Sequence, residues 1–271
     1  MTQRRRRLNK SVRSSRYAER VSPDPCPALP AAPAYPSVYP GLFISLEGGD
    51  GVGKSTQIRL LSQLLESAGV EYVVTREPGG TDLGAKIRQL ILHGDHVDPR
   101  AEALLYAADR AHHVATLIRP ALERGAVVMT DRYLDSSVAY QGVGRGLGED
   151  VRGLSLWATQ GLLPDVTILL DADPCVGAAR TSGRGQADRL ERELDGARVA
   201  LRTRFLGMAE SEPERWRVVD AARSVEEVAA QVRQVLCAAL EGRVGNESCE
   251  RLRAYLSQEG ARSGAQGGEQ A

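Results

Sequence analysis

Apolar residues follow two alternating patterns along this chain. Short runs rich in Val, Ile and Leu are separated by longer stretches in which an apolar residue recurs every three or four positions. The short runs are typical of strands buried on both faces, and the longer stretches are typical of amphipathic helices. The pattern predicts strands at residues 42–46, 70–75, 126–130, 166–170 and 216–219.

Helices are predicted between these strands. They span residues 57–68, 81–92, 102–123, 188–208 and 225–240. A further helical region opens after Tyr133 and continues through residues 153–159, and Pro120 predicts a break or kink in the third helix. Strands that alternate with helices build a parallel sheet covered on both faces. We therefore predict an α/β protein with a three-layer fold and about five parallel strands.

The segment after the first predicted strand carries the clearest chemistry. It fits the pattern G-x-x-x-x-G-K-[ST] of a phosphate-binding loop (P-loop) and consists of Gly48, Gly49, Asp50, Gly51, Val52, Gly53, Lys54, Ser55 and Thr56. Its glycines let backbone N–H groups point at phosphate oxygens, and the helix N-terminus adds a favourable dipole. We expect Lys54 to supply a positive charge on a solvent-facing stem, and Ser55 a hydroxyl for Mg²⁺. The order strand, loop, helix predicts a P-loop NTPase fold that binds a nucleoside triphosphate.

Two further segments directly follow predicted strands, at residues 76–81 and 131–133. Ligands of open parallel sheets bind outside the carboxyl ends of the strands, so both segments should meet the P-loop in one cleft. They bring Arg76 and Arg132 to that cleft, and a helix that passes through Arg110 adds a third guanidinium. An arginine fork binds a phosphate through two hydrogen bonds. Three arginines exceed what a triphosphate alone requires, which indicates a second anionic substrate.

The two ends of the chain differ from the region between them. Residues 1–20 hold eight basic residues and one acidic residue, a formal charge of +7, and seven prolines lie between residues 23 and 40. Proline at this density blocks helices and strands, so we predict a disordered extension over residues 1–40. A transit peptide, a basic tether and a misassigned start are alternative interpretations of it. We also predict a disordered tail over residues 242–271, which are rich in Gly, Ser, Gln and Glu.

Composition excludes several classes of partner for the region between. The 271 residues carry no net formal charge, so the chain outside the first 20 residues carries −7 and is not expected to bind nucleic acid. Four scattered cysteines predict free thiols and a cytoplasmic protein. No apolar run approaches transmembrane length, so no membrane partner is expected. The adjacent His112 and His113 point in different directions on a helix, and Trp157 and Trp216 are interpreted as packing residues.

Three segments around the predicted cleft discriminate far better than the P-loop. They are residues 75–81 (TREPGGT), 104–110 (LLYAADR) and 131–142 (DRYLDSSVAYQG), and residues 164–165 and 188–191 fit the same pattern. On these motifs residues 41–241 resemble the thymidylate kinases, a family of P-loop nucleoside monophosphate kinases. The resemblance implies phosphorylation of dTMP to dTDP by ATP with Mg²⁺, for dTTP synthesis, in a homodimer.

The resemblance also assigns roles to single residues in substrate binding. Asp50 falls where a carboxylate meets the 3′-hydroxyl of dTMP, Tyr106 where a ring stacks on thymine, and Tyr140 where a ring excludes a 2′-hydroxyl. The remaining substrate-binding positions hold the phosphate, contact the base or line its pocket, and they are Arg76, Pro78, Arg110, Arg132, Ser137 and Gln141. Together with Ser55, Asp131 is implied to hold Mg²⁺, in its case through water.

Gly51 lacks the arginine that some family members carry at this position of the P-loop. The resemblance places a basic lid of the bacterial type over residues 180–189, and Arg180 and Arg189 are then ATP-binding. Arg184 would supply the missing charge to the transferring phosphoryl group. The implied catalytic residues are Lys54, Asp50, Arg132 and Arg184.

Two alternatives to a thymidylate kinase stay open at the level of the sequence. One is another nucleotide or deoxynucleoside kinase, and the other is a silent nucleotide-binding module such as a GTPase-like regulator. The chain has no N-K-x-D motif for reading guanine, and the intact Lys54, Ser55, Asp131 and Arg132 favour an active enzyme. A kinase that acts on a phosphate needs no general base, because the acceptor oxygen is already charged.

Overall fold

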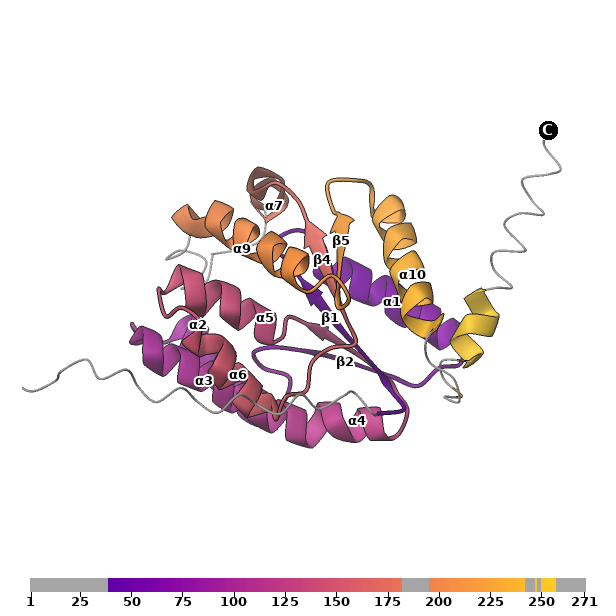
Figure 1. Ribbon diagram of the computed structural model, residues 1–271, viewed down its shortest axis with the longest axis horizontal. Helices are drawn as coiled ribbons and strands as arrows, with labels where there is room; N and C mark the ends of the chain where they lie inside the picture. Colours follow the sequence, from indigo (N-terminus) through magenta and orange to yellow (C-terminus); the bar gives the residue numbers. More distant parts are fainter. Residues whose placement is uncertain (1–38, 182–194, 242–246, 248–249, 257–271) are drawn as a thin grey trace, which may run out of the picture. The chain divides into compact units, whose positions relative to one another are not determined.

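The computed structural model describes residues 39–181, 195–241, 247 and 250–256, which are arranged as Figure 1 shows. Five parallel strands form one sheet in the order β2-β3-β1-β4-β5. The strands are β1 (Leu42–Glu47), β2 (Tyr72–Arg76), β3 (Val127–Asp131), β4 (Val166–Asp171) and β5 (Trp216–Asp220). This sheet confirms the predicted α/β fold. The strand β1 lies at its centre, and all six of its residues are buried.

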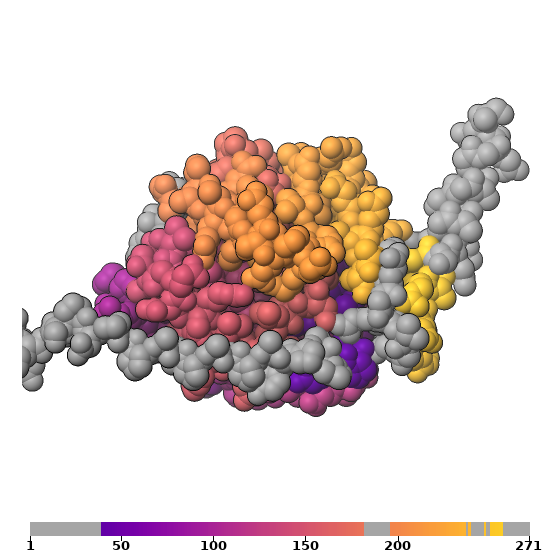
Figure 2. All heavy atoms as spheres, in the orientation of Figure 1, coloured from indigo at the N-terminus to yellow at the C-terminus, as the bar shows by residue number. Residues whose placement is uncertain are grey.

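Helices cover both faces of the sheet. One face is covered by α1 (Lys54–Ser67) and α10 (Val225–Glu241). The other face is covered by α2 (Asp82–His93), α3 (Pro99–His113), α4 (Arg119–Glu123), α5 (Leu134–Ser137), the π-helical turn η2 (Val138–Gly144), α6 (Asp150–Thr159) and α9 (Arg198–Ser211). Figure 2 shows α9 beside the helices at residues 134–159. Each sheet face therefore packs against a separate apolar cluster, as the alternation of strand side chains requires.

Two helices differ from the prediction. The helix predicted over residues 102–123 begins at Pro99 and contains a π-helical turn, η1 (Val114–Ile118), directly before α4. Pro120 has no N–H to donate, and the wide turn before it lets the helix continue where a break was predicted. The short helix α7 (Pro174–Thr181) was not predicted. Residues 182–194, which hold most of the predicted lid, lie outside the described residues, as do residues 1–38.

The predicted disordered tail contains a helical segment. Residues 250–256 are helical, and Leu252 is fully buried in the cluster that α1 and α10 share. Tyr255 and Leu256 pack against the same cluster, and the Arg251 guanidinium donates a hydrogen bond of 3.3 Å to the carbonyl oxygen of Gly69. The spacing i, i+3, i+4 of these apolar side chains places them on one helix face. The segment was predicted to be disordered because the residues around them are mostly polar or small. No helix in the described ranges is long and apolar enough to cross a membrane.

Candidate functional site

The P-loop connects β1 to α1, and backbone contacts fix its glycines. Gly48, Gly51 and Gly53 have φ angles of 129°, 77° and 104°, which favour glycine. A Cβ atom at Gly51 would lie 2.3 Å from the carbonyl oxygen of Gly177 in α7, and a Cβ at Gly177 would lie 2.4 Å from that of Asp50. The P-loop therefore touches α7 backbone to backbone, and position 51 has no space for an arginine.

Lys54 is the first residue of α1, and its side chain folds back over the loop. Its ammonium group donates hydrogen bonds to the carbonyl oxygens of Gly48 at 3.2 Å and Gly49 at 2.8 Å. We expected a solvent-facing stem, but Lys54 is buried, because the loop wraps around its aliphatic part. Burial, with the charge of Arg132, lowers the pKa of Lys54 to about 8. An anionic ligand beside this ammonium group would favour its charged form.

Arg132 donates hydrogen bonds to four groups of the site. Its guanidinium donates to the carbonyl oxygen of Gly48 at 3.0 Å, to Ser136 Oγ at 3.0 Å and to Asp50 Oδ1 at 2.6 Å. It also donates to the hydroxyl of Tyr140 at 3.1 Å and lies over that ring, 5.0 Å from its centroid. Burial alone would raise the pKa of Asp50, but Arg132 and Lys54 outweigh burial and hold this pKa below its usual value. Arg132 thus joins the P-loop to the segment after β3.

A polar cavity of about 150 Å³ opens beside this arginine. Most residues that the sequence assigned to the monophosphate line it, namely Asp50, Pro78, Tyr106, Arg110, Arg132, Ser137, Tyr140 and Gln141. They come from the P-loop, from the turn after β2, from α3 and from the segment after β3. The structure therefore brings together in one cavity residues that lie up to about 90 positions apart.

Arg110 lines this cavity from within a buried charged network. Its guanidinium donates to Glu77 at 2.7 Å, to Ser155 Oγ at 3.2 Å and to Ser137 Oγ at 3.0 Å. The other Glu77 oxygen lies 2.9 Å from Nδ1 of His113, a buried residue that is also 2.6 Å from Thr75 Oγ1. Arg110 is 1 % exposed, so the protein fixes its orientation before any ligand binds. A guanidinium held in this way is preorganised for a polar ligand.

Two tyrosines form part of the cavity wall. Tyr106 on α3 and Tyr140 on η2 are both buried at their positions in the wall. Burial raises the pKa of the Tyr140 hydroxyl well above its ordinary value, so this hydroxyl stays protonated at neutral pH. The two rings supply apolar surface, and the Tyr140 hydroxyl adds one polar group beside Arg132.

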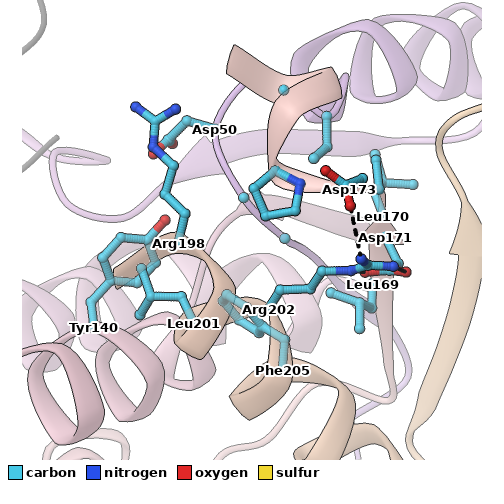
Figure 3. A pocket seen from close by; sticks show the side chains of 16 residues that line it. Asp50, Tyr140, Leu169, Leu170, Asp171, Asp173, Arg198, Leu201, Arg202 and Phe205 are labelled. Atoms are coloured by element: carbon cyan, nitrogen blue, oxygen red, sulfur yellow. Dashed lines mark hydrogen bonds and ion pairs between the residues drawn. The ribbon is translucent and has the colours of Figure 1, made fainter. Parts of the chain in front are cut away.

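A second cavity borders the P-loop on the side of α7 and α9. Its floor is apolar and includes Leu169, Leu201 and Phe205 (Figure 3). At one end Arg198 extends toward Asp50, and at the other Arg202 forms two hydrogen bonds of 2.8 Å with Asp171. Asp50 and Tyr140 also line the polar cavity, so they separate the two cavities.

Comparison with known proteins places this architecture in a family. A sequence profile described as thymidylate kinase matches residues 46–232. The chain is 61% identical over 213 residues to a thymidylate kinase of Leifsonia xyli subsp. xyli, covering 77% of this chain and 99% of the relative. It is 56% identical over 198 residues to a thymidylate kinase of Bifidobacterium longum, covering 71% and 95%. It is 45% identical over 215 residues to one of Thermosynechococcus vestitus, covering 74% and 89%.

The chain belongs to the thymidylate kinase family. The match confirms the resemblance that the sequence motifs indicated, and it covers the P-loop, the residues that line both cavities, the strands β2 to β5 and the end of β1. As a family member the protein is an enzyme of the nucleoside monophosphate kinase class.

The side chains expected to hold Mg²⁺ fit such an ion in this thymidylate kinase fold. Asp131 ends β3 next to the P-loop strand, and its Oδ1 atom is buried without a hydrogen-bond partner in the described part of the chain. A buried carboxylate oxygen needs a polar partner, and hydrated Mg²⁺ can provide one. Ser55 follows Lys54 in the first turn of α1 and is exposed. A hydroxyl and a carboxylate are typical of a magnesium site in a P-loop enzyme.

Four predicted arginines lie apart from the polar cavity or outside the described residues. Arg76 ends β2 and is exposed, whereas the following Glu77 lines the cavity. Successive side chains of a strand point to opposite faces, so Arg76 points away from the cavity. Arg180 on α7 donates a hydrogen bond of 2.9 Å to the carbonyl oxygen of Ala221, after β5. Arg184 and Arg189 lie outside the described residues. Their contacts with phosphate therefore stay predictions.

Several residues of the site were missed by the sequence analysis. Arg88 and Leu92 from α2 line the cavity, and Arg88 donates a hydrogen bond of 3.0 Å to the carbonyl oxygen of Pro78. Glu102 is fully buried and accepts hydrogen bonds from Gln141 and Arg145. A charged residue on a helix gives no local signal of burial. The position of Glu47 in a largely apolar strand was a usable signal, since a carboxylate there needs partners.

Proposed function

We propose that this enzyme transfers the γ-phosphoryl group of ATP to dTMP, which gives dTDP and ADP. The observation that carries the proposal is the junction at Arg132. This one guanidinium contacts the P-loop at Gly48 and Asp50 and also lines the cavity proposed for the monophosphate. A phosphate in that cavity would face the P-loop, as transfer between two phosphates requires.

The proposed mechanism relies on positioning and on charge. Backbone N–H groups of residues 48–56 hold the triphosphate, and Lys54 neutralises the charge that develops on the transferring group. Arg132 holds the acceptor phosphate in line with the γ-phosphate. The acceptor oxygen is already negative, so no side chain has to remove a proton from it.

We further propose that Mg²⁺ accompanies ATP in this site. Ser55 would contribute its hydroxyl, and Asp131 would hold the ion through water. When bound, Mg²⁺ neutralises phosphate charge and stabilises the charge that develops in phosphoryl transfer. The unpartnered Oδ1 of Asp131 supports this assignment.

Base and sugar selectivity are assigned to the cavity wall. Tyr106 would stack on thymine, and Arg110, Ser137 and Gln141 would read its polar edge from the network that fixes them. Tyr140 would exclude a ribose 2′-hydroxyl. Buried side chains that are held by other side chains discriminate well, because a wrong ligand leaves polar groups unpaired.

The proposed homodimer is supported by exposed apolar side chains on neighbouring helices. Leu90 on α2, Leu104 on α3 and Trp157 on α6 are exposed by 56%, 59% and 66%. Trp157 was predicted to be a packing residue but is exposed, whereas Trp216, for which the same was predicted, is buried. The helix α3 contacts both α2 and α6, so the three helices that carry these side chains lie side by side (Figure 1). Covering them with a second copy would remove exposed apolar area.

Two measurements test these proposals. Purified protein with ATP and Mg²⁺ should release ADP in the presence of dTMP, and the rate should fall with dUMP, dCMP or ribothymidine monophosphate. Equal rates with all acceptors would contradict the assignment of the cavity.

For the dimer, Leu104→Glu should lower the mass in analytical ultracentrifugation from that of two copies to that of one. A wild-type protein with the mass of one copy would contradict the proposed dimer.

A further inference from the structure

Glu47 is a fully buried carboxyl group that no step of the proposed mechanism uses. It ends β1, directly before the P-loop, and it is 0% exposed. Burying a carboxylate costs free energy unless hydrogen bonds replace its water. Three donors do so here: Tyr133 N at 2.8 Å and Ser45 Oγ at 3.1 Å bind Oε1, and Ser136 Oγ at 2.6 Å binds Oε2.

Ser136 connects this carboxylate to Arg132. Its hydroxyl donates to Glu47 Oε2, and the same oxygen accepts a hydrogen bond of 3.0 Å from Arg132 Nη1. When the Ser136 hydroxyl points its hydrogen at Glu47, the lone pairs of its oxygen point away from Glu47 and toward Arg132. The Glu47 carboxylate therefore fixes the orientation in which Ser136 accepts the hydrogen bond from Arg132. The orientation of the Arg132 guanidinium thus depends on a group on the far side of Ser136.

The backbone at Arg132 also depends on Glu47. Arg132 has a φ angle of 69°, in the left-handed region that costs a side-chain-bearing residue about 1 kcal/mol. Such a conformation persists when its surroundings fix it. Glu47 accepts from the N–H of Tyr133, the next residue, and the N–H of Arg132 itself donates to the carbonyl oxygen of Leu46 at 3.0 Å. Strand β1 therefore holds the backbone on both sides of the Arg132 side chain.

We propose that Glu47 and Ser136 are positioning residues, which hold Arg132 in the orientation that receives the phosphate of dTMP, and that Glu47 does so as a carboxylate. This inference rests on the proposed contact between Arg132 and that phosphate. Glu47 is fully buried and does not line the cavity, whereas Ser136 lines it beside Arg132, and both residues act through Arg132.

The charge state of Glu47 is sensitive to pH near neutrality. The pKa of Glu47 is raised to about 7, because burial and the nearby Asp135 raise it by more than Arg132 and the hydrogen bonds from Ser136 and Tyr133 lower it. The charge of Glu47 in turn raises the pKa of Lys54, at the end of the P-loop, and the pKa of Tyr140 in η2. A protonated Glu47 must donate its hydrogen, so Ser136 would have to give up the arrangement that orients Arg132.

Two variants break the connection at different atoms. Glu47→Gln keeps the size of the side chain but replaces one acceptor oxygen by an NH₂ donor, so it cannot accept from both Tyr133 and Ser136. Ser136→Ala removes the link and leaves both charges in place. Each variant should raise the KM for dTMP by about tenfold and leave the KM for ATP within about twofold, as expected when one charge-assisted hydrogen bond is lost.

The double variant and two controls separate the possible causes. If the residues act in series, Glu47→Gln with Ser136→Ala should raise the KM for dTMP no further than the stronger single change. Ser62→Ala is a control that also removes one serine hydroxyl, which in α1 donates a hydrogen bond to the Ile58 carbonyl oxygen. This variant should change neither KM. Additive effects, an unchanged KM for dTMP, or equal rises in both KM values would overturn the inference. If Glu47→Gln does not fold in a thermal melt, the result for Ser136→Ala decides.

Arg132→Lys distinguishes this inference from the proposed function. If this variant keeps the wild-type KM for dTMP, the proposed role of Arg132 is wrong. If it raises that KM while Glu47→Gln and Ser136→Ala do not, only the positioning role is wrong.

A pH profile gives a readout that a purely structural role would not move. The substrate phosphate itself titrates near pH 6, so we compare the ratio of kcat/KM for dTMP between wild type and Glu47→Gln. This ratio should be about ten at pH 8 and should approach one below pH 6, where wild-type Glu47 is protonated. A ratio that does not change with pH would contradict an ionised Glu47 in the working enzyme.

Discussion

The P-loop and the monophosphate cavity meet at Asp50, but different kinds of atoms shape them. Backbone geometry shapes the P-loop, where glycines with positive φ angles allow the chain to touch α7. Side chains from distant segments shape the cavity, where Glu77, Arg110 and Ser137 hold one another by hydrogen bonds. A backbone site binds any triphosphate, whereas a site of mutually fixed side chains can distinguish one base and sugar from another.

The largest effect on turnover is expected from removing Lys54, the one cation of the P-loop sequence. We predict that Lys54→Ala lowers turnover by at least about a thousandfold, because cations on a transferring phosphoryl group contribute several powers of ten to the rate. A thermal melt checks that the variant is folded. Near-normal turnover in a folded variant would show that the P-loop does not work through this side chain.

The lid should contribute the next largest effect. Since position 51 has no room for an arginine, Arg184→Ala should lower kcat about a hundredfold and change the KM for dTMP little, as for a contact made mainly in the transition state. Arg180→Ala and Arg189→Ala are the matched controls, measured by steady-state kinetics. Wild-type kcat in all three variants would show that the lid supplies no catalytic charge.

The contact between the P-loop and α7 tests whether the backbone shapes this half of the site. Gly177→Ala would place a Cβ 2.4 Å from the carbonyl oxygen of Asp50, so the loop must shift. We expect a KM for ATP raised by about tenfold or more and a lower melting temperature. Gly207→Ala in α9 is the control, since a Cβ there meets no atom within 4 Å. Equal behaviour of the two variants would contradict the contact.

A substitution in the monophosphate cavity should change the selectivity between substrates instead of the rate. Tyr140→Ala should narrow the ratio of kcat/KM between dTMP and ribothymidine monophosphate by about tenfold, because it opens space where a 2′-hydroxyl would lie. Tyr140→Phe keeps the ring and should preserve this ratio, although it removes the hydroxyl that accepts from Arg132. A ratio unchanged by the alanine substitution would place sugar selection elsewhere.

The smallest expected effect concerns stability. The pKa of Glu47 is raised from 4.5 to about 7 and that of Asp109 from 3.8 to about 6, each mainly by burial. The unfolded chain therefore releases these protons at lower pH than the folded chain does, so both groups make the free energy of unfolding fall between about pH 4 and pH 7. Denaturant unfolding of Glu47→Gln should show a weaker fall than wild type above pH 5. An identical pH dependence would contradict a raised pKa at Glu47.

The same contrast explains what could be predicted from the sequence. The strand before Gly48, the P-loop and α1 are contiguous, so local pattern and glycine placement were sufficient for them. The segments that carry Tyr106, Arg110 and Tyr140 were assigned by their resemblance to a family, and the structure places them around one cavity. Local pattern did not reveal that Glu47 contacts Ser136, because 89 positions separate these residues. Long-range pairing of polar side chains leaves no periodic signal.

Two other features were hidden for related reasons. Pro120 predicted a break, but the preceding π-helical turn lets the helix continue, and turns of that kind have no simple sequence signature. Leu252 lies in a segment whose composition indicates disorder, yet it packs in the cluster of α1 and α10. A few apolar residues at helical spacing are sufficient for docking when a complementary surface exists, and that surface is known only from the fold.

The central claim is that one enzyme site joins a P-loop to a cavity selective for dTMP. The most direct test is the steady-state rate of ADP release with ATP and Mg²⁺, measured for dTMP, dUMP, dCMP and ribothymidine monophosphate as acceptors. We predict a kcat/KM for dTMP that exceeds every other value by about tenfold or more. ADP release that does not depend on the acceptor, or a higher kcat/KM for any other monophosphate, would contradict the claim.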